Sequence, residues 1–95
     1  MIRINEVIKV LENWAPLAYQ ESYDNCGLLT GNSADEVKGI MICLDTTEAV
    51  LDEAIKENCN LIIAHHPILF SGLKKITGRN YVERVIIQAI KNNLA

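Results

Sequence analysis

The sequence predicts an α/β fold: a parallel or mixed sheet built from βαβ units with flanking helices, forming an incomplete layered α/β domain over residues 1–95. Two short segments, 40–44 and 61–64, are continuously apolar, as buried strands are. The segment between them has the apolar spacing of an amphipathic helix. A strand, a helix and a strand at this spacing form a βαβ unit, whose two strands run parallel with a right-handed crossover.

Composition supports a folded chain and excludes several classes of partner. Apolar residues make up 49% of the sequence and charged residues 22%, a balance outside the range of disordered chains. A net charge of −3 without a Lys/Arg cluster argues against binding to nucleic acid. No apolar run approaches the roughly 18 to 20 residues of a membrane span, and no signal-peptide pattern opens the chain. We expect a cytoplasmic protein with no membrane partner.

The cysteines give no sign of a disulfide framework or a zinc-binding motif. Cys26, Cys43 and Cys59 are odd in number, widely spaced and free of any Cys-x-x-Cys arrangement. We therefore expect reduced, buried thiols.

The first element is a helix from about Asn5 to Trp14, with Asn5 as its cap and Pro16 as its stop. Its apolar residues recur three and four positions apart, at Val7, Val10, Leu11 and Trp14. In the following segment, 21–31, Asx and Gly residues bracket a short apolar piece that could form a brief strand.

The central βαβ unit follows. The segment 40–44 is predicted to be a strand buried on both faces. Thr46 or Thr47 can cap the next helix, which has Glu48 in its first turn and ends before Asn58. Its apolar face consists of Val50, Leu51, Ala54 and Ile55.

A loop over residues 67–78 precedes the last predicted helix. Asn80 and Glu83 resemble a capping box, and a helical apolar period continues to about Asn92. The apolar pair 94–95 after this helix resembles the first step of another parallel strand.

Two adjacent histidines, His65 and His66, are the strongest chemical signal, because imidazole is the commonest neutral metal ligand. Parallel strands end at the same edge of a sheet, so Asp45 should lie near them. Neighbouring side chains of a strand point in opposite directions, so the histidines reach one ion only if the chain turns at once; otherwise they serve two neighbouring ions. Pro67 holds His66 in an extended conformation. Two-metal centres, with ions about 3.5 to 4 Å apart, activate water for hydrolysis.

Other interpretations of these residues remain open. His65 and His66 could instead cap the strand or hydrogen-bond to loop backbone. Asp45 could be a third ligand, or simply the residue that leads into the next helix. Two imidazoles alone fall short of the roughly three or four protein ligands of a stable zinc site. No catalytic residue can be assigned.

The remaining candidates are weaker. Asp24 and Asn25 could line a pocket, although Asx-Gly loops are usually turns. Lys74, Lys75 and Arg79 could attract an anionic substrate such as a phosphate ester, or could be solvated loop charges.

Three ordered motifs resemble the Nif-three-like family, whose members are often called GTP cyclohydrolase 1 type 2 homologs. They are Tyr-Asp-Asn-Cys-Gly-Leu-Leu-Thr-Gly at 23–31, Leu-Asp-Thr-Thr at 44–47 and Ile-Ile-Ala-His-His-Pro-Ile-Leu-Phe at 62–70. The resemblance implies an α/β fold, toroidal hexamers and a dinuclear metal centre in which His65 and His66 each contribute a ligand. The divalent metal ion could be zinc, iron or manganese.

The chain departs from the family in length. Family members supply further ligands from a His-Thr-x-x-Asp segment beyond residue 95 and from a distant His-x-x-x-Glu pair, so we expect an amino-terminal portion of the family fold. The resemblance implies a metal-binding protein, either a metal-dependent hydrolase of a phosphate- or nucleotide-like small molecule or a non-catalytic regulatory or assembly module. Apolar helix faces that a short chain cannot cover predict a homo-oligomer.

Overall fold

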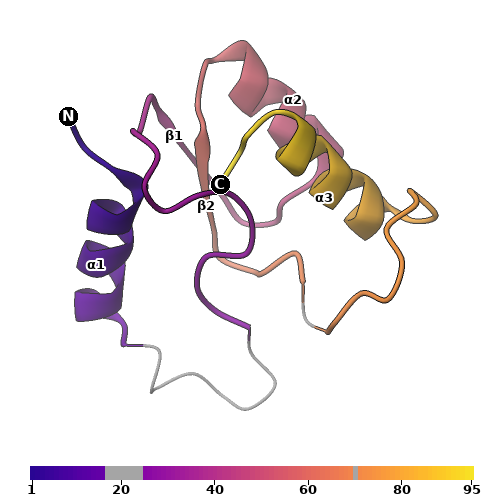
Figure 1. The fold of residues 1–95 in the computed structure, drawn as a ribbon, viewed down its shortest axis with the longest axis horizontal. Coiled ribbons are helices and arrows are strands. Elements are labelled where there is room, and N and C mark those ends of the chain that lie inside the picture. Colours follow the sequence, from indigo (N-terminus) through magenta and orange to yellow (C-terminus); the bar gives the residue numbers. More distant parts are fainter. Residues whose placement is uncertain (17–24, 70) are drawn as a thin grey trace.

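The computed structural model describes residues 1–16, 25–69 and 71–95 (Figure 1). In chain order its elements are α1 (Ile4–Trp14), β1 (Ile40–Cys43), α2 (Glu48–Lys56), β2 (Leu61–Ala64) and α3 (Tyr81–Lys91). The strands β1 and β2 pair in parallel, with Ile40 opposite Leu61 and Cys43 opposite Ala64. The predicted α/β class and the predicted βαβ unit are therefore confirmed.

The core lies between one face of the sheet and two helices. Leu51 of α2 packs with Val85 and Ala89 of α3 and with Leu94, and Ile62 of β2 packs against this cluster. Figure 1 shows α2 and α3 together on one side of the strands and α1 on the other. The helices α2 and α3 thus bury most of their apolar stripes against each other and against the sheet, while Ile55 (41%) and Ile90 (60%) remain exposed.

The prediction that β1 is buried on both faces is wrong. Ile40 is 43% exposed and Ile42 is 77% exposed. Alternate residues of a strand share a face, so Ile40 and Ile42 lie opposite the face that carries Met41. Because α2 and α3 cover only the face that includes Ile62, the side chains of Ile40 and Ile42 remain open to solvent.

The start of α1 also differs from its prediction. Arg3, not Asn5, is at the N-cap position, and it makes no side-chain capping hydrogen bond. The first helical N–H groups are satisfied by the backbone of another segment instead: Ile4 donates to the Asp35 carbonyl (2.9 Å) and Asn5 to the Ser33 carbonyl (2.8 Å). Helix N–H groups need acceptors, and here a neighbouring loop supplies them.

The other two helices have the predicted caps. Thr47 accepts a hydrogen bond from the backbone N–H three residues on (3.2 Å). Asn80 does the same for Glu83 at the start of α3 (3.0 Å). The capping box of α3 is modified, however, because the Glu83 carboxylate accepts from the backbone N–H groups of Thr77 (3.0 Å) and Arg79 (3.3 Å).

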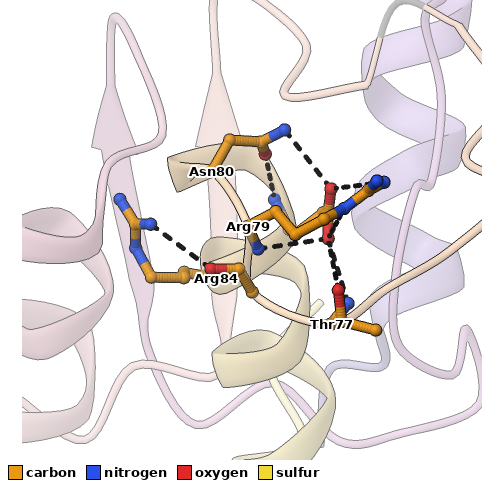
Figure 2. Close-up of polar contacts among 6 residues, drawn as sticks. Thr77, Arg79, Asn80 and Arg84 are labelled. Atoms are coloured by element: carbon orange, nitrogen blue, oxygen red, sulfur yellow. Dashed lines mark hydrogen bonds and ion pairs between the residues drawn. The ribbon is translucent and has the colours of Figure 1, made fainter.

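The carboxylate of Glu83 binds the loop before α3 through hydrogen bonds and an ion pair, and its side chain is only 1% exposed. Figure 2 shows Thr77, Arg79 and Asn80 around this carboxylate, and the Arg79 guanidinium lies 3.2 Å from it. The Thr77 backbone N–H is the main reason that the pKa of Glu83 falls from an ordinary 4.5 to about 2. Burial opposes this lowering of the pKa and Arg79 adds to it. A buried carboxylate with this many donors stays ionised.

The chain end pairs with β2, which agrees with the prediction that residues 94–95 begin another parallel strand. Ala95 donates to the Asn60 carbonyl and accepts from the Ile62 N–H, both at 2.8 Å, which is the pattern of a parallel neighbour. Gly31 lies against this end with φ +91°, and a Cβ at Gly31 would meet the Ala95 Cβ at 2.6 Å.

Three further sequence expectations concern loops, thiols and membranes. The brief strand suggested for 21–31 is absent over 25–31, where bends replace it, and 21–24 lie outside the described residues. Burial of the thiols is also wrong: Cys26 is exposed in a loop, and Cys43 and Cys59 are half-buried. Within the described ranges, no helix is long and apolar enough to cross a membrane.

Candidate metal centre

The sheet register places the predicted site residues together. Main-chain pairing continues past the ends of the strands, since the His65 N–H donates to the Cys43 carbonyl (3.1 Å) and the His66 N–H to the Leu44 carbonyl (3.0 Å). This pairing brings Asp45, the residue after Leu44, beside His66. The predicted convergence at the carboxyl edge of the sheet is confirmed.

The two imidazole rings lie next to each other. Their centroids are 4.7 Å apart and their planes meet at 61°. Side chains of consecutive residues on a regular strand point in opposite directions, so this proximity shows that the chain turns immediately after Ala64. Both side chains are exposed. In the described part of the chain, neither ring hydrogen-bonds to a main-chain carbonyl, so they are not strand caps bonded to loop backbone.

Asp45 contacts His66 directly. Its Oδ1 lies 2.8 Å from Nδ1 of the ring, with side-chain exposures of 63% for Asp45 and 51% for His66. A polar contact this exposed contributes about 0 to 1 kcal/mol to stability. Asp45 is not the cap of α2, because Thr47 has that role.

A groove of about 560 Å³ adjoins the histidines. His65 and His66 line it together with apolar residues from α1, the sheet and the 25–30 loop, among them Val7, Leu11, Leu28 and Ile63. Asn25 also lines it, which agrees with the weaker of its two interpretations, whereas Asp24 lies outside the described residues. The Asn25 side-chain amide donates to the Leu69 carbonyl (2.7 Å) and thereby ties two groove-lining loops together.

The donor set fits part of a metal site. Two exposed imidazoles with adjacent rings are suitable ligands for a divalent ion. Among the described residues, however, no group of three or more His, Cys, Asp or Glu side chains is arranged to hold a metal ion. A stable zinc site needs roughly three or four protein ligands, and the described residues bring two imidazoles together.

The candidate anion-binding cations do not form a cluster. Lys74 and Lys75 are exposed loop residues, and Arg79 is paired with Glu83. Sequence reasoning identified Glu83 only as part of a helix cap. It also could not find the Asn25–Leu69 hydrogen bond, because nothing in either local sequence indicates a partner 44 residues away.

These features define an α/β protein that carries adjacent histidines at the carboxyl edge of a parallel βαβ sheet, beside an apolar groove. Residues 2–95 match the family described as Duf34/NIF3 (NGG1p interacting factor 3), and the chain belongs to this family.

Named relatives agree with this assignment. The chain is 42% identical over 93 residues to the "GTP cyclohydrolase 1 type 2 homolog" of Clostridium acetobutylicum, covering 98% of this chain and 35% of that protein. It is 37% identical over 94 residues to "NIF3-like protein 1" of Drosophila melanogaster, covering 98% of this chain and 32% of that protein. The chain thus spans about a third of the length of these relatives.

Solved structures have the same fold. Staphylococcus aureus protein SA1388 superposes with a TM-score of 0.92 at 34% identity, over 98% of this chain and 30% of that one. Reduced HcgD from Methanocaldococcus jannaschii superposes with a TM-score of 0.87 at 29% identity, over 98% of this chain and 37% of that one.

Proposed function

We propose that this chain binds divalent metal ions, with His65 and His66 as ligands. The observation that carries the proposal is the pair of exposed imidazoles with centroids 4.7 Å apart at the carboxyl edge of the sheet. Imidazoles suit zinc and iron, and manganese is a further candidate. Cys43 and Cys59 are free thiols, which fits a reducing compartment, and we place the activity in the cytoplasm.

The proposed activity is metal-dependent hydrolysis of a phosphate- or nucleotide-like small molecule. A bound divalent centre would supply a water of lowered pKa as nucleophile. His65 and His66 line the groove, and its apolar lining limits access of bulk water to a small molecule bound there. The phosphate-like substrate class comes from the names of the relatives.

A second function, a non-catalytic metal-binding or assembly module, is favoured by one observation. Among the described residues, no group of three His, Cys, Asp or Glu side chains is arranged to hold a metal ion. Ligands supplied by further copies or by other chains would complete the site. The exposed apolar side chains Trp14 (85%) and Ile42 (77%) favour such a homo-oligomer. A monodisperse monomer in size-exclusion chromatography at micromolar concentration would contradict self-association.

Calorimetric titration of the purified chain with Zn²⁺, Mn²⁺ and Fe²⁺ tests the proposal. We expect binding by the wild type and its loss in His65→Ala and His66→Ala, with Lys56→Ala, an exposed residue of α2, as the matched control. Each chain is then assayed with generic phosphoesters. Metal binding with turnover supports the hydrolase, and metal binding without turnover supports the module. A wild-type chain that binds none of the three ions refutes both functions.

A further inference from the structure

The contact between Asp45 and His66 is created by the fold, not by local sequence. The Oδ1 and Nδ1 atoms are 2.8 Å apart although the residues are 21 positions apart in the chain. Pairing of the His66 N–H with the Leu44 carbonyl (3.0 Å) holds the two chain segments side by side at this point. The fold therefore places the Asp45 carboxylate beside Nδ1 of the His66 ring.

The chemistry of the two groups fixes the direction of this hydrogen bond. An ionised carboxylate only accepts hydrogen bonds, so Nδ1 must carry the proton. A neutral imidazole has a single N–H, which leaves the lone pair on Nε2, on the far side of the ring from Asp45. A histidine in this tautomer is prepared to bind an ion through Nε2. Carboxylates that hold ligating histidines in this way recur in metal sites.

We propose that Asp45 is a positioning residue that acts through His66: it fixes the Nδ1–H tautomer and makes Nε2 the metal-binding atom. This inference rests on the proposed metal-binding function. It replaces the alternative that Asp45 is itself a ligand, because its Oδ1 contacts the ring and no group of three His, Cys, Asp or Glu side chains among the described residues is arranged to hold an ion. His65 has no such partner among the described residues, so the two imidazoles differ: the tautomer of His66 is preset and that of His65 is adjustable.

The tautomer can be measured without metal. Nitrogen-15 NMR of the metal-free chain, at a pH where both imidazoles are neutral, reports which ring nitrogen carries hydrogen. We expect the Nδ1–H form of His66 to dominate in the wild type and in Asp45→Asn, whose amide oxygen still accepts. In Asp45→Ala this preference should disappear. A wild-type His66 with its hydrogen mainly on Nε2, or an unchanged tautomer in Asp45→Ala, overturns the proposal.

Zinc titration separates positioning from direct ligation. Asp45→Ala should weaken Zn²⁺ binding about 10- to 100-fold, the usual effect of removing a residue that orients a ligand. Asp45→Asn should lose clearly less, because its amide oxygen still accepts from Nδ1 of His66. If Asp45 is instead a ligand, Asp45→Asn will weaken Zn²⁺ binding as much as Asp45→Ala does.

The two proposals fail in different ways. A wild-type chain that binds no Zn²⁺ refutes the metal function, while the tautomer measurement still decides whether Asp45 orients His66. A chain that binds Zn²⁺ with the same affinity after Asp45→Ala refutes positioning alone. Because Asp45 is exposed, its variants should fold, and circular dichroism checks this.

Discussion

Replacing Leu51 by Ala tests the packing that holds the sheet beneath the site. The Leu51 side chain is fully buried, at 0% exposure, in the cluster that joins α2, α3 and β2. The substitution removes the equivalent of three methylene groups, about 2.4 kcal/mol at about 0.8 kcal/mol each. A cavity term is added, but Leu51 also borders the groove, so the space can partly collapse or fill with water. We therefore expect a loss of about 2.5 to 3.5 kcal/mol, within the usual range for Leu→Ala.

Ile55→Ala is the matched control for this prediction. Ile55 is on the same helix but is 41% exposed, so its truncation should cost about 1 kcal/mol or less. The free energy of unfolding is measured by urea denaturation followed by circular dichroism. If Leu51→Ala destabilises the chain no more than Ile55→Ala, the assignment of the core to the α2–α3 face of the sheet is incorrect.

Three further predictions concern the loops. Gly31→Ala should lower the free energy of unfolding by about 1 to 3 kcal/mol, because φ +91° disfavours a side chain and the new Cβ would clash with Ala95; an unchanged urea midpoint would contradict this. Because the pKa of Glu83 is lowered, the stabilisation that its ionised carboxylate gives the fold is complete above about pH 4.5 and is lost as the pH falls towards 2. The urea midpoint of the wild type should therefore fall more steeply with falling pH over this range than that of Glu83→Gln. Identical slopes in the two chains would exclude the effect. Asn25→Asp removes the donor to the Leu69 carbonyl and should lower the free energy of unfolding, measured by urea denaturation, by about 1 kcal/mol. The control is Asn13→Asp, at an exposed position. A loss no greater than that of the control would argue against a stabilising hydrogen bond between Asn25 and Leu69.

Local chemistry explains why much of the fold was predictable from sequence. The strand at 61–64 was predicted with its observed bounds, because an apolar run between polar residues leaves few alternatives. The caps at Thr47 and Asn80 followed from hydroxyl and amide side chains at helix starts. Because parallel strands end at the same edge of a sheet, the sequence also predicted that Asp45 lies near the histidines.

The features that sequence could not predict depend on contacts between distant segments. Exposure of Ile42 follows from which face of the sheet the helices cover, and strand composition does not reveal that. The N–H groups at the start of α1 bond to residues 33–35, so no capping side chain is required there. The choice of Nδ1 of His66 as the partner of Asp45 is likewise set by register and ring orientation.

The proposed metal centre depends on His65 and His66 binding one metal site together. They are the only two histidines in the sequence, so nitrogen-15 labelling of histidine reports on these two rings alone. Stepwise addition of Zn²⁺ should shift the ring signals of both residues, with both shifts saturating at the same ratio of metal to protein. Ring signals that stay in place at excess Zn²⁺ would contradict the claim.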